Sequence, residues 1–145
     1  MALKEFFDYI DNNEDYISKN ESKNHNVLTF AFVGDALFTL FVRSYLVEIS
    51  TAKSGILHIK TTNFVKASYQ AYLIDNMSML NEEEKQIVLS ARNVKTHNIA
   101  KNSNLEEYKK STSFEALIGY LYLTYQTERL TEVLNFCKIE MEKKI

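Results

Sequence analysis

The chain contains no proline and no tryptophan, and only three glycines and one cysteine among its 145 residues. Proline and glycine build most tight turns, so their scarcity disfavours an all-β sandwich and excludes collagen-like and linker-like chains. The single cysteine, Cys137, cannot form an intramolecular disulfide, which is typical of a protein from a reducing compartment. The remaining composition, with 46% hydrophobic and 25% charged residues, is typical of one ordinary globular domain.

The chain also has little that resembles a targeting or membrane-spanning segment. Glu5 and Asp8 lie where a signal peptide has basic and then apolar residues. The most apolar stretch, Leu28 to Val42, is 15 residues long and contains Asp35. A helix that spans a bilayer needs about 20 apolar residues, so this stretch is too short. We therefore expect a soluble, cytoplasmic protein.

Charge is distributed unevenly along the chain, although the net charge is only −2. Residues 1–26 contain three basic and six acidic residues, whereas residues 52–110 contain nine basic and six acidic residues. A basic surface can therefore exist locally on an acidic protein. This asymmetry permits a nucleic-acid partner without requiring one.

Hydrophobic residues recur with helical spacing through most of the chain, which predicts an all-α fold. The predicted helices cover residues 3–10, 26–48, 61–79, 82–95, 105–125 and 128–143. Polar, aperiodic segments at 11–26 and 96–104 are expected to be loops. We expect residues 1–25 to form a short helix and a polar loop, and residues 26–145 to form a single helical domain.

Two acidic residues occupy positions where their predicted helices are otherwise apolar. Asp35 has mostly apolar facial neighbours, so its carboxylate is expected to be shielded from water, and Glu115 is placed similarly. Each acid has a glycine nearby, Gly34 directly before Asp35 and Gly119 one turn after Glu115. Glycine inside a helix is unfavourable and needs an explanation, which the close approach of another helix or of a ligand would supply. If the two helices cross at these glycines, the two carboxylates face each other.

Paired carboxylates need a counter-charge, and two explanations remain open at this point. Oxygen ligands with open coordination positions suit Mg²⁺. Alternatively, a lone acid in an apolar helix has a purely structural explanation: it forms an ion pair, for which Arg43 lies two turns beyond Asp35, or it points to an exposed edge of the helix.

Basic residues surround the second polar segment and precede it on the chain. Such residues contact nucleic-acid phosphates in some proteins, but more often they form a solvated surface. The candidates for RNA contact are Lys60, Lys66, Arg92, Lys95 and Lys101.

The segments that carry the two acids resemble the signatures of the ribonuclease III family. Residues 32–37 (Phe-Val-Gly-Asp-Ala-Leu) are similar to its first signature, and residues 113–119 (Ser-Phe-Glu-Ala-Leu-Ile-Gly) to its second. The chain resembles most the family's minimal branch, Mini-III, which consists of the catalytic domain alone. Further similarities to that branch, in the same order, are Val42-Arg43, Leu57-His58, Gln70-Ala71, Arg92-Asn93-Val94-Lys95, Lys101-Asn102, Tyr108, Ser111-Thr112 and Glu128-Arg129-Leu130.

This resemblance implies an all-α endonuclease domain that forms a homodimer and lacks a double-stranded-RNA-binding domain. It implies that Asp35 and Glu115 are the catalytic and metal-binding residues, with Mg²⁺ as the cofactor, and that the basic candidates contact RNA. The implied reaction is cleavage of double-stranded RNA that leaves 5′-phosphate and 3′-hydroxyl ends. The implied task is maturation of the ends of the large-subunit ribosomal RNA precursor.

The sequence departs from ribonuclease III proper at three acidic positions, which are Leu28, Ala31 and Thr112 here. Mini-III proteins similarly lack acidic residues at such positions. Two further positions, Thr39 and Ser68, differ from residues often found in that branch. The alternative function is therefore a non-catalytic protein that binds duplex RNA or assists ribosome assembly. A purely structural helical dimer, with no affinity for RNA, is a third hypothesis.

Overall fold

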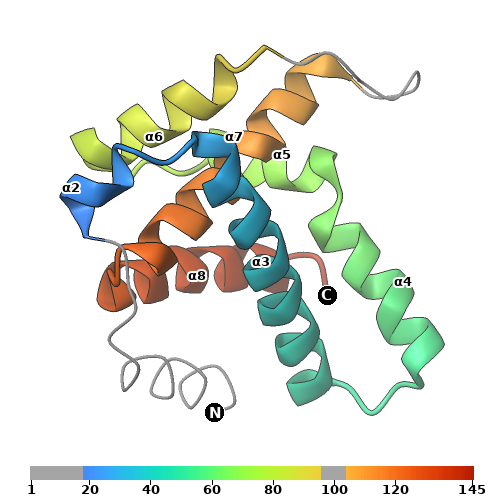
Figure 1. Ribbon diagram of the computed structural model, residues 1–145. Coiled ribbons are helices and arrows are strands. Elements are labelled where there is room, and N and C mark those ends of the chain that lie inside the picture. The colour runs from blue at the N-terminus through green and yellow to red at the C-terminus, as the bar shows by residue number, and fades with distance from the viewer. Residues whose placement is uncertain (1–17, 96–103) are drawn as a thin grey trace.

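The computed structural model describes residues 18–95 and 104–145, and in these ranges all regular structure is helical. The helices are α2 (Lys19–Ser22), α3 (Val27–Ile49), α4 (Ser54–Val65), α5 (Ala67–Asp75), α6 (Glu82–Arg92), α7 (Leu105–Leu123) and α8 (Thr127–Glu142). Figure 1 shows their arrangement. The predicted all-α fold is confirmed for this part of the chain.

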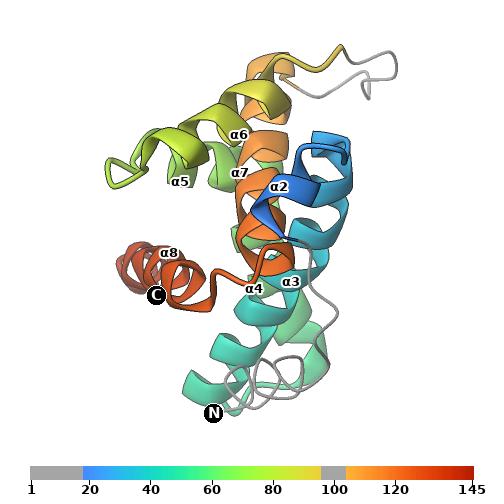
Figure 2. The same ribbon diagram turned by 60° about the vertical axis from the view of Figure 1, so that its left-hand side comes forward.

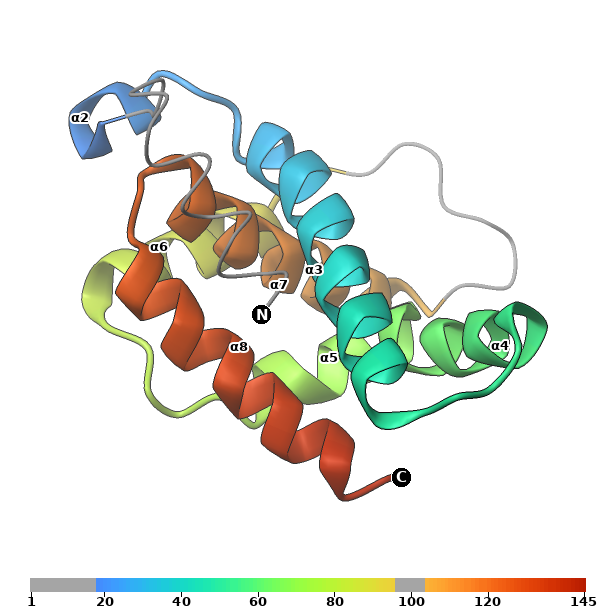
Figure 3. The same ribbon diagram turned by 90° about the horizontal axis from the view of Figure 1, so that it is seen from below.

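Helices α3 and α7 form the centre of the domain and pack against each other more extensively than any other pair. Figure 2 shows these two helices running side by side, with α6 and α5 beside α7. Figure 3 shows α8 lying across the lower side. Fully buried side chains from both central helices form the core, and the Phe38 and Phe114 rings meet edge to face with centroids 4.8 Å apart. Burial of such aromatic side chains is a main source of the stability of the central pair.

The two central helices cross at Gly34 and Gly119. A Cβ atom on Gly34 would lie 1.7 Å from the carbonyl oxygen of Glu115, and one on Gly119 would lie 1.8 Å from the carbonyl oxygen of Phe30. No side chain fits into such a gap, so glycine is required at both positions. The predicted crossing is confirmed, and it explains the two glycines inside helices.

Helix α3 is longer than the apolar stretch noted in the sequence. It has 23 residues with a mean hydropathy of 1.6, so by length and composition alone it is able to cross a bilayer. The expectation that this segment is too short was therefore wrong. We interpret α3 as the central core helix, because its Phe38 and Val42 side chains are completely buried in the domain.

The segment predicted as one helix over 61–79 forms two helices separated at Lys66. Lys66 is extended, with φ −67° and ψ 154°, and α4 begins earlier than predicted, at Ser54. No proline or glycine marks this break. The break allows Phe64 of α4 and Tyr69 of α5 to pack edge to face with centroids 5.2 Å apart, and neither partner can be recognised from local sequence.

The segment predicted as a loop over 11–26 contains the short helix α2. Its N-terminus is formed by a capping box, in which the Ser18 hydroxyl accepts a hydrogen bond from the Glu21 backbone and the Glu21 carboxylate accepts one from the Ser18 backbone. The remaining helix boundaries agree with the prediction to within a few residues. The predicted helix at 3–10 lies outside the described residues.

Candidate active site

The helix crossing brings Asp35 and Glu115 together. Asp35 follows Gly34 on α3, and Gly34 approaches the backbone of Glu115 on α7. Burial raises the pKa of the Glu115 carboxyl, and the neighbouring Asp35 carboxylate raises it further, to about 8. With this raised pKa, the Glu115 carboxyl is largely protonated at neutral pH in the metal-free protein.

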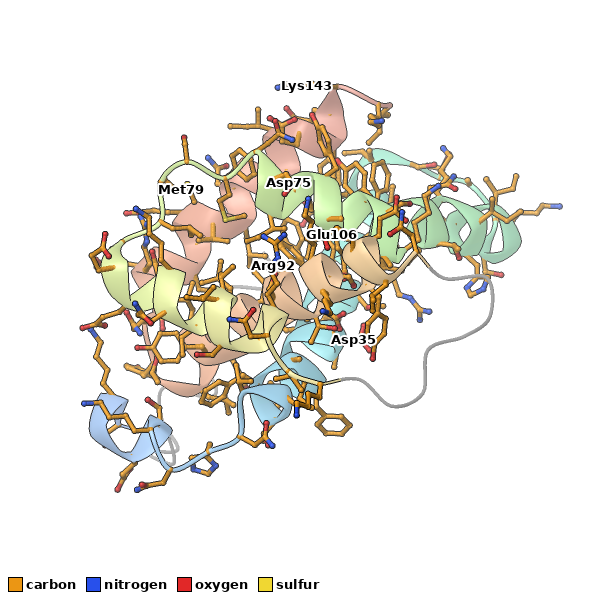
Figure 4. The ribbon with its side chains drawn as sticks, turned by 90° about the horizontal axis from the view of Figure 1, so that it is seen from above. Asp35, Asp75, Met79, Arg92, Glu106 and Lys143 are labelled. Carbon is orange, nitrogen blue, oxygen red and sulfur yellow. The ribbon has the colours of Figure 1, made fainter. Side chains whose placement is uncertain are left out.

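Asp35 itself is exposed, in contrast to the expectation that its apolar neighbours shield it from water, and in agreement with the alternative that it points to an exposed edge of its helix. Its neighbours Phe38 and Val42 face the core and are buried, whereas Leu28 and Phe32 are exposed on the side of α3 that no other described helix covers. Phe32, one turn before Asp35, is 80% exposed. Figure 4 shows Asp35 where α3 passes α7. The half-buried Glu115 and the exposed Asp35 therefore form a site that is open to water on one side.

The structural ion pair between Asp35 and Arg43 is not formed. Among the described residues, no ion pair joins these two side chains. Among residues 18–95 and 104–145, no ion pair involves either Asp35 or Glu115, so no described cationic side chain balances the carboxylate pair.

Two polar residues behind Glu115 complete the site. The Ser111 hydroxyl lies 3.2 Å from Oε1 of Glu115 and 2.7 Å from Oε1 of Gln70 on α5. Gln70 is 1% exposed and Ser111 is 6% exposed. Sequence analysis named Ser111 and Gln70 only among the similarities to the Mini-III branch and did not assign them to the site. The available signal for Gln70 was a polar residue between the aromatic Tyr69 and the apolar Ala71 and Leu73.

The donor set fits a hard divalent cation. Two carboxylates with no balancing side chain among the described residues are suitable ligands for Mg²⁺, and a bound cation would offset both the burial of Glu115 and its repulsion from Asp35, which raise its pKa. In the described part of the chain, no group of three or more His, Cys, Asp or Glu side chains gathers. The described residues therefore offer two carboxylates, and water or substrate would complete the coordination of a bound cation.

Two of the basic candidates, Lys60 and Lys66, lie at a different place from this pair. Lys60 and Lys66 are exposed and line a cavity of about 530 Å³ with Leu46, Phe64 and Tyr69. Leu46 lies 11 residues beyond Asp35, or about 16 Å along the axis of α3. This cavity is thus distinct from the carboxylate pair.

Arg92 and Lys95 lie at and beyond the end of α6. The Arg92 guanidinium forms a hydrogen-bonded ion pair with Glu106 at the start of α7, and both side chains are about half exposed. Figure 4 shows Arg92 and Glu106 together. Lys95 is exposed, and Lys101 lies outside the described residues.

Comparison with known proteins decides the family. The model of the family described as "Ribonuclease III domain" matches residues 28–126, a range that contains both acids and both glycines. The chain belongs to the ribonuclease III family. It is therefore an endoribonuclease, a hydrolase that cuts within an RNA chain.

Several curated relatives of this ribonuclease are named Mini-ribonuclease 3. The protein of Enterococcus faecalis is 43% identical over 118 residues, which cover 79% of this chain and 89% of the relative. The Thermoanaerobacter protein is 36% identical over 133 residues, which cover 91% of this chain and 93% of the relative. A crystal structure of a Fusobacterium nucleatum protein is 28% identical, with a TM-score of 0.75, and the match covers 86% of this chain and 98% of that protein. The resemblance to the Mini-III branch is confirmed.

The three positions at which the ribonuclease lacks acids show no substitute metal ligand. Leu28 is 41% exposed and Ala31 is buried, and neither side chain has a polar atom. The Thr112 hydroxyl donates a hydrogen bond to the carbonyl oxygen of Tyr108 in its own helix. Asp35 and Glu115 are therefore the candidate ligands of the site.

Proposed function

We propose that this endoribonuclease cleaves double-stranded RNA in a Mg²⁺-dependent reaction, with Asp35 and Glu115 as the catalytic, metal-binding pair. The observation that carries the proposal is the carboxylate pair at the glycine crossing, which has no balancing side chain among the described residues and in which the pKa of Glu115 is about 8. Two repelling carboxylates, one of them half-buried, lower the stability of the metal-free protein. Such a pair is expected where a cation and a phosphate bind.

Each residue of the site has a part in the proposed reaction. Asp35 and Glu115 would hold the metal, which when bound polarises the phosphoryl group and makes water a better nucleophile. The exposed side of Asp35 leaves room for the scissile phosphate. Water attacks phosphorus in line with the 3′ oxygen and loses its proton to solvent. The bond between phosphorus and the 3′ oxygen then breaks, and that oxygen takes a proton, which leaves a 5′-phosphate and a 3′-hydroxyl.

We propose that Lys60, Lys66, Arg92, Lys95 and Lys101 contact the RNA backbone. Duplex RNA is recognised mostly by its shape, phosphates and 2′-hydroxyls, so basic residues spread over a wide surface suit it better than one compact patch. To contact RNA, Arg92 has to leave Glu106 and bind a phosphate. This exchange costs little free energy because the ion pair is half exposed.

We propose a homodimer that forms through the exposed apolar stripe of α3. Leu28, Phe32, Ala36, Leu40 and Val47 follow one face of this helix and are all exposed. The exposed Arg43 lies on the same face between Leu40 and Val47, and an exposed stripe that is apolar apart from one arginine usually marks an interface. A second copy is the proposed occupant, because two sites beside a twofold interface place one carboxylate pair on each strand of a duplex.

The state of assembly can be measured directly. Sedimentation or light scattering should give a dimer for the wild type and a monomer for Phe32→Asp, which places a charge in the stripe. A wild type that is monomeric at high concentration contradicts the dimer.

The proposed substrate is the large-subunit ribosomal RNA precursor, in the cytoplasm. The support is similarity to relatives named Mini-ribonuclease 3 at 36–43% identity over most of the chain. Incubation of the protein with a precursor transcript, followed by mapping of the ends, tests this substrate.

The competing function is binding of duplex RNA without cleavage. The observation in its favour is that the site holds two carboxylates and that the positions of three further family acids are Leu28, Ala31 and Thr112. A long duplex RNA incubated with Mg²⁺ or with EDTA separates the two functions. Cutting that requires Mg²⁺ and is lost in Asp35→Asn supports the nuclease, whereas binding without cutting under all conditions supports the competitor.

A further inference from the structure

Ser111 makes a contact that its neighbours on α7 do not make. Hydroxyls inside helices commonly donate back to a carbonyl of their own helix. Thr112 donates to the Tyr108 carbonyl at 3.0 Å, and Ser113 donates to the Lys110 carbonyl at 2.7 Å. The Ser111 hydroxyl instead reaches Gln70 and Glu115. The Ser111 hydroxyl therefore bonds side chains of the site in place of the helix backbone that its neighbours bond.

The hydrogen-bonding capacity of these groups restricts how they are arranged. The Ser111 hydroxyl has one proton, but oxygens of Gln70 and Glu115 both lie within hydrogen-bonding distance of it, at 2.7 and 3.2 Å. Only one oxygen can accept that proton. A half-turn of the Gln70 amide, which exchanges its nearly identical oxygen and nitrogen, puts an N–H donor against the Ser111 oxygen. The hydroxyl proton is then free for the Glu115 carboxylate.

We infer that Gln70 is a positioning residue for the metal-binding carboxylate. Gln70 donates to Ser111, and Ser111 donates to Oε1 of Glu115, which holds the other carboxylate oxygen toward Asp35. This inference rests on the proposed function, because it takes Asp35 and Glu115 as the metal-binding pair. It adds α5 to a site that the family signatures place on α3 and α7 alone.

The break between α4 and α5 gives Gln70 its place. Helix α5 restarts after Lys66, and the Gln70 backbone N–H donates to the Lys66 carbonyl at 3.1 Å in its first turn. The side chain is 1% exposed at the contact between α5 and α7. A buried amide is costly unless it is hydrogen-bonded, so Gln70 has little freedom to leave Ser111.

The test uses the variants Gln70→Met and Ser111→Ala. Methionine has a volume similar to that of glutamine but lacks its amide donor and acceptor. Mg²⁺ affinity of the full-length protein is measured by calorimetry without RNA, together with cleavage at varied Mg²⁺. Loss of a residue that orients a metal ligand typically lowers metal affinity about 10- to 100-fold. We expect such a loss in both variants. Ser113→Ala is the matched control, because its hydroxyl bonds the helix backbone, and its Mg²⁺ affinity should equal that of the wild type.

The double variant Gln70→Met/Ser111→Ala shows whether Gln70 acts through Ser111. If it does, the double variant binds Mg²⁺ no more weakly than Ser111→Ala. A further loss in the double variant overturns the inference, and so does wild-type affinity in Gln70→Met. If the wild type binds no Mg²⁺, the proposed function itself fails, which is a different result.

A second measurement does not need a substitution at Gln70 and therefore does not depend on whether Gln70→Met folds. In ¹H–¹⁵N spectra, the side-chain amide signals of Gln70 should shift in Ser111→Ala and on addition of Mg²⁺ to the wild type. Signals that stay in place in both cases overturn the inference.

Discussion

Gly34 and Glu115 lie in backbone contact, so closely that a Cβ on Gly34 would overlap the Glu115 carbonyl oxygen at 1.7 Å. This contact places Asp35, the next residue, beside the Glu115 side chain. The same pair of residues therefore determines both the packing of the central helices and the distance between the two acids.

Gly34→Ala should separate α3 from α7 and damage the fold and the activity together. Neither the carbonyl nor the helix can move aside without repacking the core, so we expect a loss of at least about 3 kcal/mol in the free energy of unfolding, or no folded protein. Urea denaturation measures this loss. Gly55→Ala is the matched control: no atom lies within 4 Å of its added methyl group, and alanine favours a helix over glycine, so we expect a gain of up to about 1 kcal/mol. Equal stability of the two variants would contradict the crossing.

Mg²⁺ affinity should rise with pH between about 6.5 and 8. The pKa of Glu115 is about 8 without metal, so below that pH the metal has to displace a proton. Each pH unit below 8 should weaken binding by up to tenfold, and the affinity should level off above pH 8. Calorimetric titrations in buffers of different pH measure the affinity and the proton released. A constant Mg²⁺ affinity with no proton release would contradict the raised pKa of Glu115.

Glu115→Gln should inactivate the enzyme and stabilise the metal-free protein. The pKa of Glu115 is raised above its unfolded value of 4.5, so the folded state holds this proton more tightly and loses stability as the pH rises from about 4.5 to 8. Glutamine removes that loss, so the variant should gain about 1–3 kcal/mol over the wild type at pH 8 and nothing at pH 4. Thermal unfolding in EDTA at both pH values measures the difference. A gain that is the same at pH 4 and pH 8 would show that ionisation of Glu115 is not its cause.

Arg129→Met should be strongly destabilising. Its guanidinium makes hydrogen bonds of 2.8 Å from Nε and from Nη2 to Glu84, which is 1% exposed at the N-terminus of α6, and it also bonds the Met79 carbonyl. Burial opposes ionisation of Glu84, but hydrogen bonds from Arg129 and the Asn81 backbone lower its pKa below the usual value, so the carboxylate is charged and needs its partner. Removing one partner of a buried pair costs about 3–5 kcal/mol.

Arg92→Met is the matched control, because its ion pair with Glu106 is half exposed. Such pairs contribute about 1 kcal/mol or less, and chemical denaturation at pH 7 compares the two variants. A small loss for Arg129→Met would mean that Glu84 takes up a proton or water once its partner is removed.

Much of this protein follows from local sequence. The 3.6-residue periodicity identified α3, α6, α7 and α8 to within a few residues, and two acids and two glycines in apolar helices suggested a crossing of α3 and α7 at the glycines. The capping box of α2 was also present in the sequence, in Ser18 and Glu21, but was not recognised. These features are visible because they depend on residues only a few positions apart.

Other features depended on residues that only folding brings together. The break at Lys66 is not marked by proline or glycine in the sequence, and it depends on how Phe64 and Tyr69 pack. The exposure of Asp35 depends on which face of α3 the rest of the domain leaves uncovered, and the contact from Gln70 to Ser111 joins residues 41 positions apart. Periodicity shows that a face is apolar, but it does not show what covers that face. Burial and side-chain hydrogen bonds between helices are properties of the packed domain, and they determine the environment of the two acids.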